Sequence, residues 1–195
     1  MRKIKILLLR FSVLIILMCC NIVLFAQIEN DTLIYWSKSR PLTSQDFQGV
    51  IPSSKVKTNE VANISSSISS NGSSLNKYSI PEYTILVFFL KRESWKKPDF
   101  SLSELNHEQT HFDITELYGR KIRALIQKLN DQGVKDVSIY KKEIDGLFNE
   151  EKKTDEMYDR ETRNGRDLLK QKAWDEKITK ELETLKEFEV DYSEM

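Results

Sequence analysis

The sequence predicts an α+β fold in which a small antiparallel sheet precedes long helices. The first observation is a change near residue 100, because residues 27–100 read as β-rich segments and loops while residues 101–195 carry a helical periodicity. The second is a pair of histidines four residues apart, the only two in the chain, at the start of that helical part. Residues 27–195 are few enough for one domain with a single core, and no internal repeat is visible.

Residues 1–26 have the pattern of a secretory signal peptide. A basic start, "MRKIKILLLR", precedes an apolar stretch that ends at Ala26, and we expect cleavage after that residue. The alternative is a retained signal anchor, although the apolar run 11–25 is short for a membrane span and the sequence has no second one. The protein is therefore expected to be secreted or periplasmic, with no membrane span after removal of the signal.

Composition limits the partners and metal sites of the mature chain. Both cysteines, Cys19 and Cys20, lie inside the signal segment, so neither a disulfide nor a thiolate metal site is expected. Removing the four basic residues of that segment lowers the 30 Lys and Arg to 26, against 30 Asp and Glu, which gives a net charge of −4. This charge argues against binding to nucleic acid or to an anionic membrane surface. Any metal must be held by His, Asp or Glu.

Three segments are expected to form strands, at residues 31–36, 57–69 and 82–94. The third is rich in Val, Ile, Phe, Tyr and Thr, as a largely buried strand should be. The second fits one arm of a hairpin whose turn is expected at Asn71-Gly72. The large side chains expected to pack on the core are Trp36, Leu42, Phe47, Trp95 and Trp174.

Helices are expected after Pro98. The first has Ser101 or Ser103 as its cap and ends in "NDQG", residues 130–133. At 100° per residue, one stripe of this helix, expected to face the core, contains His107, His111, Tyr118, Ile122, Leu125 and Leu129. From residue 141 onwards more than half of the residues are charged, which predicts long, partly solvated helices. Their sparse apolar stripe consists of Tyr158, Thr162, Leu169, Ile178, Leu182 and Leu185.

The sequence "HEQTH", His107 to His111, has the spacing of a zinc site. Two imidazoles at i and i+4 project from adjacent turns of one helix, and they can share one zinc ion. Glu108 lies about 100° round the helix from His107, beside the ligands, where its carboxylate can take a proton from a zinc-bound water and pass it to a leaving amine. The alternative is a pair of hydrogen-bonded core histidines. A β-rich strand before the motif and a periodic helix after it favour the metal.

A zinc site needs a third protein ligand, and the mature chain has no further His or Cys to supply it. It must be a carboxylate. Asp113 and Glu116 point away from the histidine stripe, so neither is expected to bind the metal. The better source is "DEMYDRETRNG", where Asp159 is the first choice and Glu161 and Asp155 are the alternatives. In so charged a region each acid taken alone is more often a solvated surface group.

Three segments resemble a known family. They are "YWSKSRPLTSQDFQG", "HEQTHFDITELYGRKIR" and "YDRETRNG", followed by Gln171 and Trp174. In this order, over nearly the whole mature chain, they are similar to bacterial secreted zinc-dependent proteases first catalogued as a domain of unknown function. The resemblance implies a zincin-like fold, zinc ligation by His107 and His111, and Glu108 as the catalytic acid and base. The chain departs from the family pattern at Ser44, where Trp is frequent, and at Asn164, where His is frequent.

Three functions follow from these observations. The first is a zinc endopeptidase that acts on peptide or protein substrates, with zinc on His107, His111 and Asp159, Glu108 as general base, and Tyr158 as a candidate oxyanion stabiliser. The second is a non-enzymatic envelope protein that keeps the metal and binds a partner. The third is an amidase of cell-wall peptide, which uses the same ligands. By analogy with zincin-like proteases, the strand 84–90 is expected to be an edge strand that pairs with extended substrate.

Overall fold

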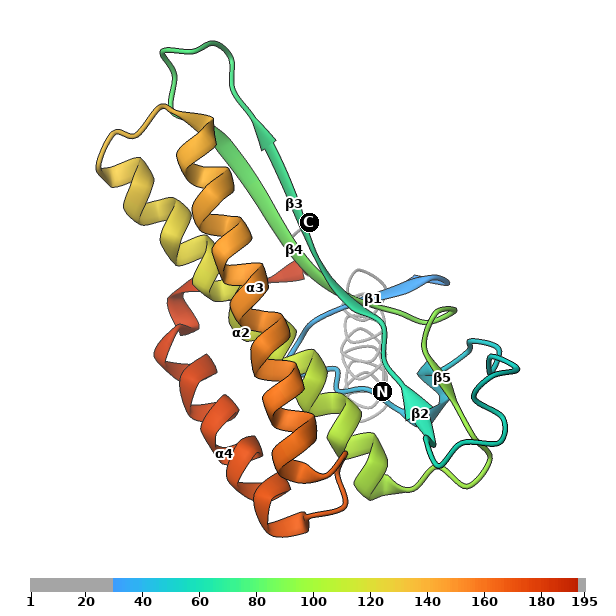
Figure 1. Cartoon of the computed structure of the whole chain (residues 1–195). Helices are drawn as coiled ribbons and strands as arrows, with labels where there is room; N and C mark the ends of the chain where they lie inside the picture. Colours follow the sequence, from blue (N-terminus) through green and yellow to red (C-terminus); the bar gives the residue numbers. More distant parts are fainter. Residues whose placement is uncertain (1–29, 193–195) are drawn as a thin grey trace, which may run out of the picture.

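A computed structural model of the chain describes residues 30–192, so the predicted signal peptide lies outside the described residues. Within them a small antiparallel sheet is followed by the helices α2 (Leu102–Asp131), α3 (Val137–Thr162) and α4 (Leu168–Thr184), as Figure 1 shows. The α+β class and the long C-terminal helices are therefore as predicted. Among the helices of residues 30–192, none is long and apolar enough to cross a membrane.

The main sheet has the strand order β1-β4-β3, and all of its pairs are antiparallel. Its strands are β1 (Leu33–Tyr35), β3 (Ser66–Ser73) and β4 (Glu82–Leu90), while β2 (Ala62–Asn63) pairs separately with β5 (Trp95–Lys96). Because β4 is hydrogen-bonded on both sides, the expectation that residues 84–90 form an edge strand was wrong. β1 and β3 are the edges of this sheet, and the most apolar strand, β4, occupies the centre, where both of its edges are hydrogen-bonded.

The hairpin turn was predicted in the wrong place. Asn71 and Gly72 lie inside β3, paired with Thr84 and Tyr83, and the chain reverses over residues 74–81. Gly72 allows the Tyr83 ring to approach the backbone closely, because a Cβ built on residue 72 would lie 2.4 Å from Cε1 of Tyr83. The Tyr83 ring covers the glycine across the strand pair and itself stacks on Tyr140 of α3, with ring centroids 5.4 Å apart.

The helix boundaries follow their caps. The Ser101 hydroxyl accepts a hydrogen bond from the backbone N–H of Glu104, and the Glu104 carboxylate accepts one from the backbone N–H of Ser101, which forms a capping box. Asp136 caps α3 by accepting from the backbone N–H of Ser138, and Asp167 caps α4 by accepting from that of Lys170. Two short 3-10 helices complete the chain, η1 (Ser44–Asp46) before β2 and η2 (Lys186–Phe188) after α4.

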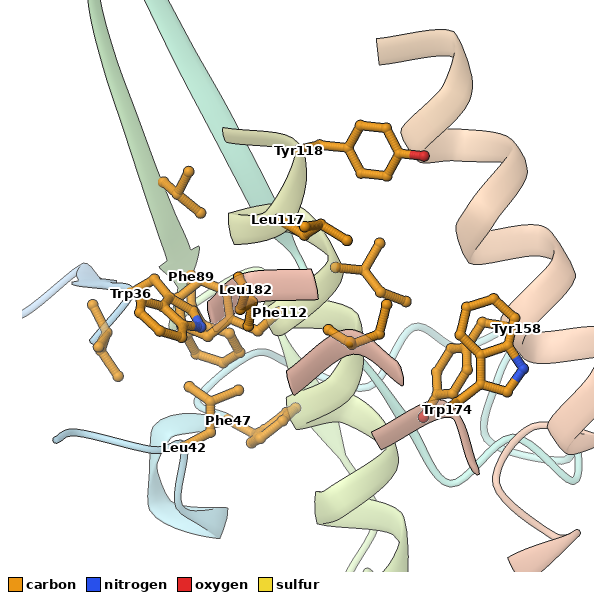
Figure 2. Packing of buried hydrophobic residues seen from close by; sticks show 14 residues of the cluster. Trp36, Leu42, Phe47, Phe89, Phe112, Leu117, Tyr118, Tyr158, Trp174 and Leu182 are labelled. Carbon is orange, nitrogen blue, oxygen red and sulfur yellow. The ribbon is translucent and has the colours of Figure 1, made fainter. Parts of the chain in front are cut away.

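The core lies around α2, which packs against the sheet on one side and against α3 and α4 on the other. Figure 2 shows Trp36, Phe89 and Phe112 grouped on one side of this helix and Tyr158 with Trp174 on the other. All five large side chains that were expected to pack on the core are buried. The predicted stripe fails at Leu169, which is 84% exposed, because it lies on the face of α4 opposite to the buried Ile178, nine residues further on.

Candidate metal centre

Both histidines lie near the start of α2 and face the other two helices. The ring of His107 is buried and that of His111 is mostly buried, and their centroids lie 4.8 Å apart because four residues make about one helical turn. Tyr158 of α3 stacks on His107 with centroids 4.7 Å apart and meets His111 edge-on at 4.8 Å. This aromatic contact restricts both imidazoles to one orientation.

Asp159 on α3 supplies the carboxylate. Its Oδ1 lies 3.1 Å from Nε2 of His107 and 3.0 Å from Nε2 of His111. The three ligand atoms all lie within 4.8 Å of one another, so this group could hold a metal ion. Tetrahedral zinc ligands at bond lengths of 2.0–2.2 Å are roughly 3.4 Å apart, which is close to these separations. Asp159, the first choice from the sequence, is the acid that the fold brings to both rings.

The other ring nitrogens leave these Nε2 atoms available. Nδ1 of His107 lies 3.2 Å from Oε1 of Gln171, and Nδ1 of His111 lies 2.9 Å from Oδ1 of Asp155. Both partners are acceptors, so each Nδ1 donates a hydrogen bond, and each Nε2 faces Oδ1 of Asp159. Two imidazole nitrogens and a carboxylate oxygen therefore converge on one point, where a cation in place of the Nε2 protons would be bound by all three.

Charge in this centre favours a bound cation. Burial by itself would lower the pKa of His111, but hydrogen bonds and Coulombic attraction from Asp155 and Asp159 outweigh it and raise that pKa to about 10. Burial would likewise raise the pKa of Asp159, yet the two imidazoles hold it well below its usual range. The same carboxylates that stabilise a proton on the ring would stabilise a divalent ion.

Glu108 lies beside the three ligands and not among them. Its side chain is buried, and its charge interacts with those of His111, His107 and Asp159. Burial raises the pKa of the Glu108 carboxyl, while the imidazoles and a hydrogen bond from the backbone N–H of Ile64 act in the opposite direction. Ile64 lies in the connection between β2 and β3, so this connection contacts Glu108. A raised carboxyl pKa next to a cation site suits a residue that accepts and returns a proton.

The position of Tyr158 does not fit an oxyanion stabiliser. The residue is fully buried behind the histidines, and its hydroxyl lies 2.8 Å from Oε1 of Gln171 and 3.1 Å from the backbone oxygen of His107. Both partners are acceptors inside the helical layer, so the hydroxyl proton is already used there. The tyrosine was predicted to touch substrate, and this geometry instead makes it part of the support for His107.

The other carboxylates considered from the sequence have separate partners. Asp155 accepts from His111, and Glu161 accepts from the Trp174 indole at 2.9 Å, which leaves Glu161 away from the histidines. Asp113 accepts from the Trp36 indole at 2.8 Å, and Glu116 is buried in an ion pair with Arg120. As expected, Asp113 and Glu116 turn away from the centre. Both have structural roles: Asp113 connects the segment before η1 to α2 through Trp36, and Glu116 pairs with Arg120 inside the core.

The turn after α3 brings Gly165 against His107. Arg163, Asn164 and Gly165 all have positive φ, at 55°, 53° and 77°. A Cβ on Gly165 would lie 3.0 Å from both Cβ and Cγ of His107, so only glycine combines this backbone with this contact. Asn164, which stands where the resembled family often has His, is exposed and donates its backbone N–H to the oxygen of Asp159 at 2.8 Å. Its backbone thus caps the helix that carries the carboxylate.

Sequence reasoning missed the support that α4 and Gly165 provide. Gln171 and Asp175 are polar and lie on the buried side of α4, and a buried Gln in an otherwise apolar stripe was the available signal. Gly165 follows Asn164 in a short turn and reads as an ordinary helix terminator. Comparison with protein-family models, with curated proteins and with solved structures found no match to this chain.

Proposed function

We propose that this protein is an exported, zincin-like zinc peptidase that hydrolyses peptide bonds in peptide or protein substrates. The observation that carries the proposal is the convergence of His107, His111 and Asp159 with the carboxylate of Glu108 directly beside them. Two imidazole nitrogens and one carboxylate are a ligand set of catalytic zinc sites, which keep a fourth position for water or substrate. The family resemblance of the three sequence segments points the same way.

Each residue has a defined role in this proposal. His107, His111 and Asp159 would hold zinc, which would polarise the scissile carbonyl and lower the pKa of the attacking water. Glu108 takes the proton from that water and delivers it to the leaving amine. Gln171 and Asp155 keep the two imidazoles oriented through their Nδ1 atoms.

Exposure of the ligands supports access from one side. The side chain of His107 is 7% exposed, whereas that of Asp159 is 42% exposed, so the centre is closed behind His107 and open beside Asp159. The segment at Ile64 lies over Glu108, which places an extended backbone next to the proton acceptor. In the proposed function, a peptide therefore approaches the centre from the side of Asp159.

The test compares wild type with Glu108→Gln at matched zinc content, using cleavage of a quenched fluorescent casein. The amide keeps the size of the side chain and removes the base, so we expect turnover to fall roughly a hundredfold or more while zinc stays bound. Glu156→Gln makes the same chemical change at an exposed position on α3 and serves as the control. Zinc binding without any wild-type cleavage would indicate the non-enzymatic binding protein, and cleavage of cell-wall peptide alone would indicate the amidase.

A further inference from the structure

A chain of buried polar groups leads from α4 to His107. Asp175 Oδ1 accepts from Nε2 of Gln171 at 2.7 Å and from the hydroxyl of Thr110 at 2.7 Å, and its Oδ2 accepts from Asn106 at 2.9 Å. Gln171 is 4% exposed and its Oε1 faces Nδ1 of His107 and the hydroxyl of Tyr158.

The carboxylate of Asp175 decides which way the Gln171 amide points. An ionised carboxylate only accepts hydrogen bonds, so the NH₂ group of the amide must face it. The amide oxygen is then forced to the other side, toward His107, 3.2 Å from Nδ1. An amide oxygen at that position accepts a hydrogen bond and cannot donate one. His107 must therefore carry a proton on Nδ1, which leaves Nε2, 3.1 Å from Oδ1 of Asp159, as the nitrogen that can bind a metal ion.

We infer that Gln171 and Asp175 are positioning residues that set the tautomer and orientation of His107 for metal binding. This inference rests on the proposed function for its consequence, because the tautomer matters only if Nε2 binds zinc. Tyr158 and Thr110 complete the arrangement, since each satisfies one remaining hydrogen-bonding group of the glutamine. Nδ1 of His111 contacts the carboxylate of Asp155 directly. Nδ1 of His107 is instead linked to the carboxylate of Asp175 through the amide of Gln171.

Two variants of the chain test this directly. Gln171→Met keeps the length of the side chain and removes both hydrogen-bonding groups, so we expect zinc affinity to fall by about 10- to 100-fold in a chelator competition. The double variant Gln171→Glu with Asp175→Asn exchanges the carboxylate and the amide. It restores an acceptor at Nδ1 of His107, and we expect its zinc affinity to return to within about threefold of wild type. A side chain that served only as packing would show no such rescue.

Nitrogen NMR of ¹⁵N-histidine protein gives a readout independent of zinc affinity and of activity. The chain has two histidines and hence four ring nitrogens, which makes assignment simple. We expect a protected Nδ1 proton on His107 in wild type and in the double variant, and its loss in Gln171→Met. An Nδ1 proton equally protected in all three, or one located on Nε2, would overturn the inference.

The two proposals fail in different ways. If wild type bound no zinc, the proposed function would fall, while the Nδ1 signal of the metal-free protein would still decide the role of Gln171. If Gln171→Met did not fold, as judged by circular dichroism, the double variant alone would decide. A folded double variant that lacked the protected Nδ1 proton would refute the positioning role.

Discussion

Gly165→Ala perturbs the metal centre through a single methyl group. Gly165 has a φ of +77°, and the new Cβ would lie 3.0 Å from Cβ and Cγ of His107 and 3.3 Å from its Nδ1. The left-handed backbone by itself costs an L-residue about 1–2 kcal/mol. The contact adds to that cost, because the ring or the turn must move by a few tenths of an ångström. A domain of this size loses about 2–4 °C of Tm per kcal/mol, so we expect Tm to fall by at least about 2–8 °C.

Gly133 provides a matched control for this substitution. It lies in the turn after α2 with a φ of +68°, and a Cβ built there has nothing within 4 Å. Gly133→Ala therefore carries the backbone cost without the contact. We expect the positive φ to cost both alanine variants a comparable amount of stability. Only Gly165→Ala should also lose zinc affinity, by about tenfold, because only it displaces His107.

Thermal unfolding by circular dichroism and zinc competition with a fluorescent chelator measure the two effects separately. Each is recorded on wild type and on both alanine variants at the same zinc content. Equal zinc affinity in Gly133→Ala and Gly165→Ala would refute the argument that the turn after α3 holds His107 in place. Unchanged stability of Gly133→Ala would instead show that the cost assigned to positive φ is too large.

Five further substitutions give separate tests of the metal ligands and of the fold. His107→Ala and His111→Ala should each abolish stoichiometric zinc binding, since removal of one of three protein ligands leaves a weak site, and native mass spectrometry gives the zinc content. Asp159→Ala should lower zinc affinity at least about tenfold in a chelator titration. Asp113→Ala should lower Tm and leave zinc affinity unchanged, because its carboxylate binds the Trp36 indole. The opposite order of zinc affinities would show that Asp159 is not the third ligand. Gly146→Ala, at an exposed position inside α3 with no neighbour within 4 Å, should raise stability by about 0.5–1 kcal/mol in urea unfolding.

The parts of the fold that local chemistry determines were predictable from the sequence. The start of α2 follows from Ser101 and Glu104, three residues apart, and its inward face follows from the helical period. The hairpin turn was not predictable in this way. Gly72 signals a turn when it is considered with Asn71 alone, and its actual role depends on the ring of Tyr83, which only the strand register brings opposite. The central place of β4 likewise depends on pairing between distant segments.

In the metal centre, too, the residues within one helix were predictable and the contact with the distant helix α4 was not. His107, Glu108 and His111 are readable because they belong to one helix, and Asp159 because it shares a face of α3 with its neighbours. Gln171 is separated from His107 by 64 residues, and its contact depends on how α4 packs on α2. No spacing within the sequence encodes such a contact, although a buried glutamine is a sign that some partner must exist.

The metal ligands and the amide that orients His107 come from three different helices, and this determines what a measurement of thermal stability can test. The histidines come from α2, Asp159 from α3, and the amide that orients His107 from α4, so an ion bound here would connect all three helices. Bound zinc at a thousand times its Kd would stabilise the fold by about 4 kcal/mol, whether or not the protein is an enzyme. A zinc-dependent rise in Tm therefore tests the metal site alone. Only turnover can separate a peptidase from a zinc-stabilised binding protein, because both would keep the metal and its stabilising effect.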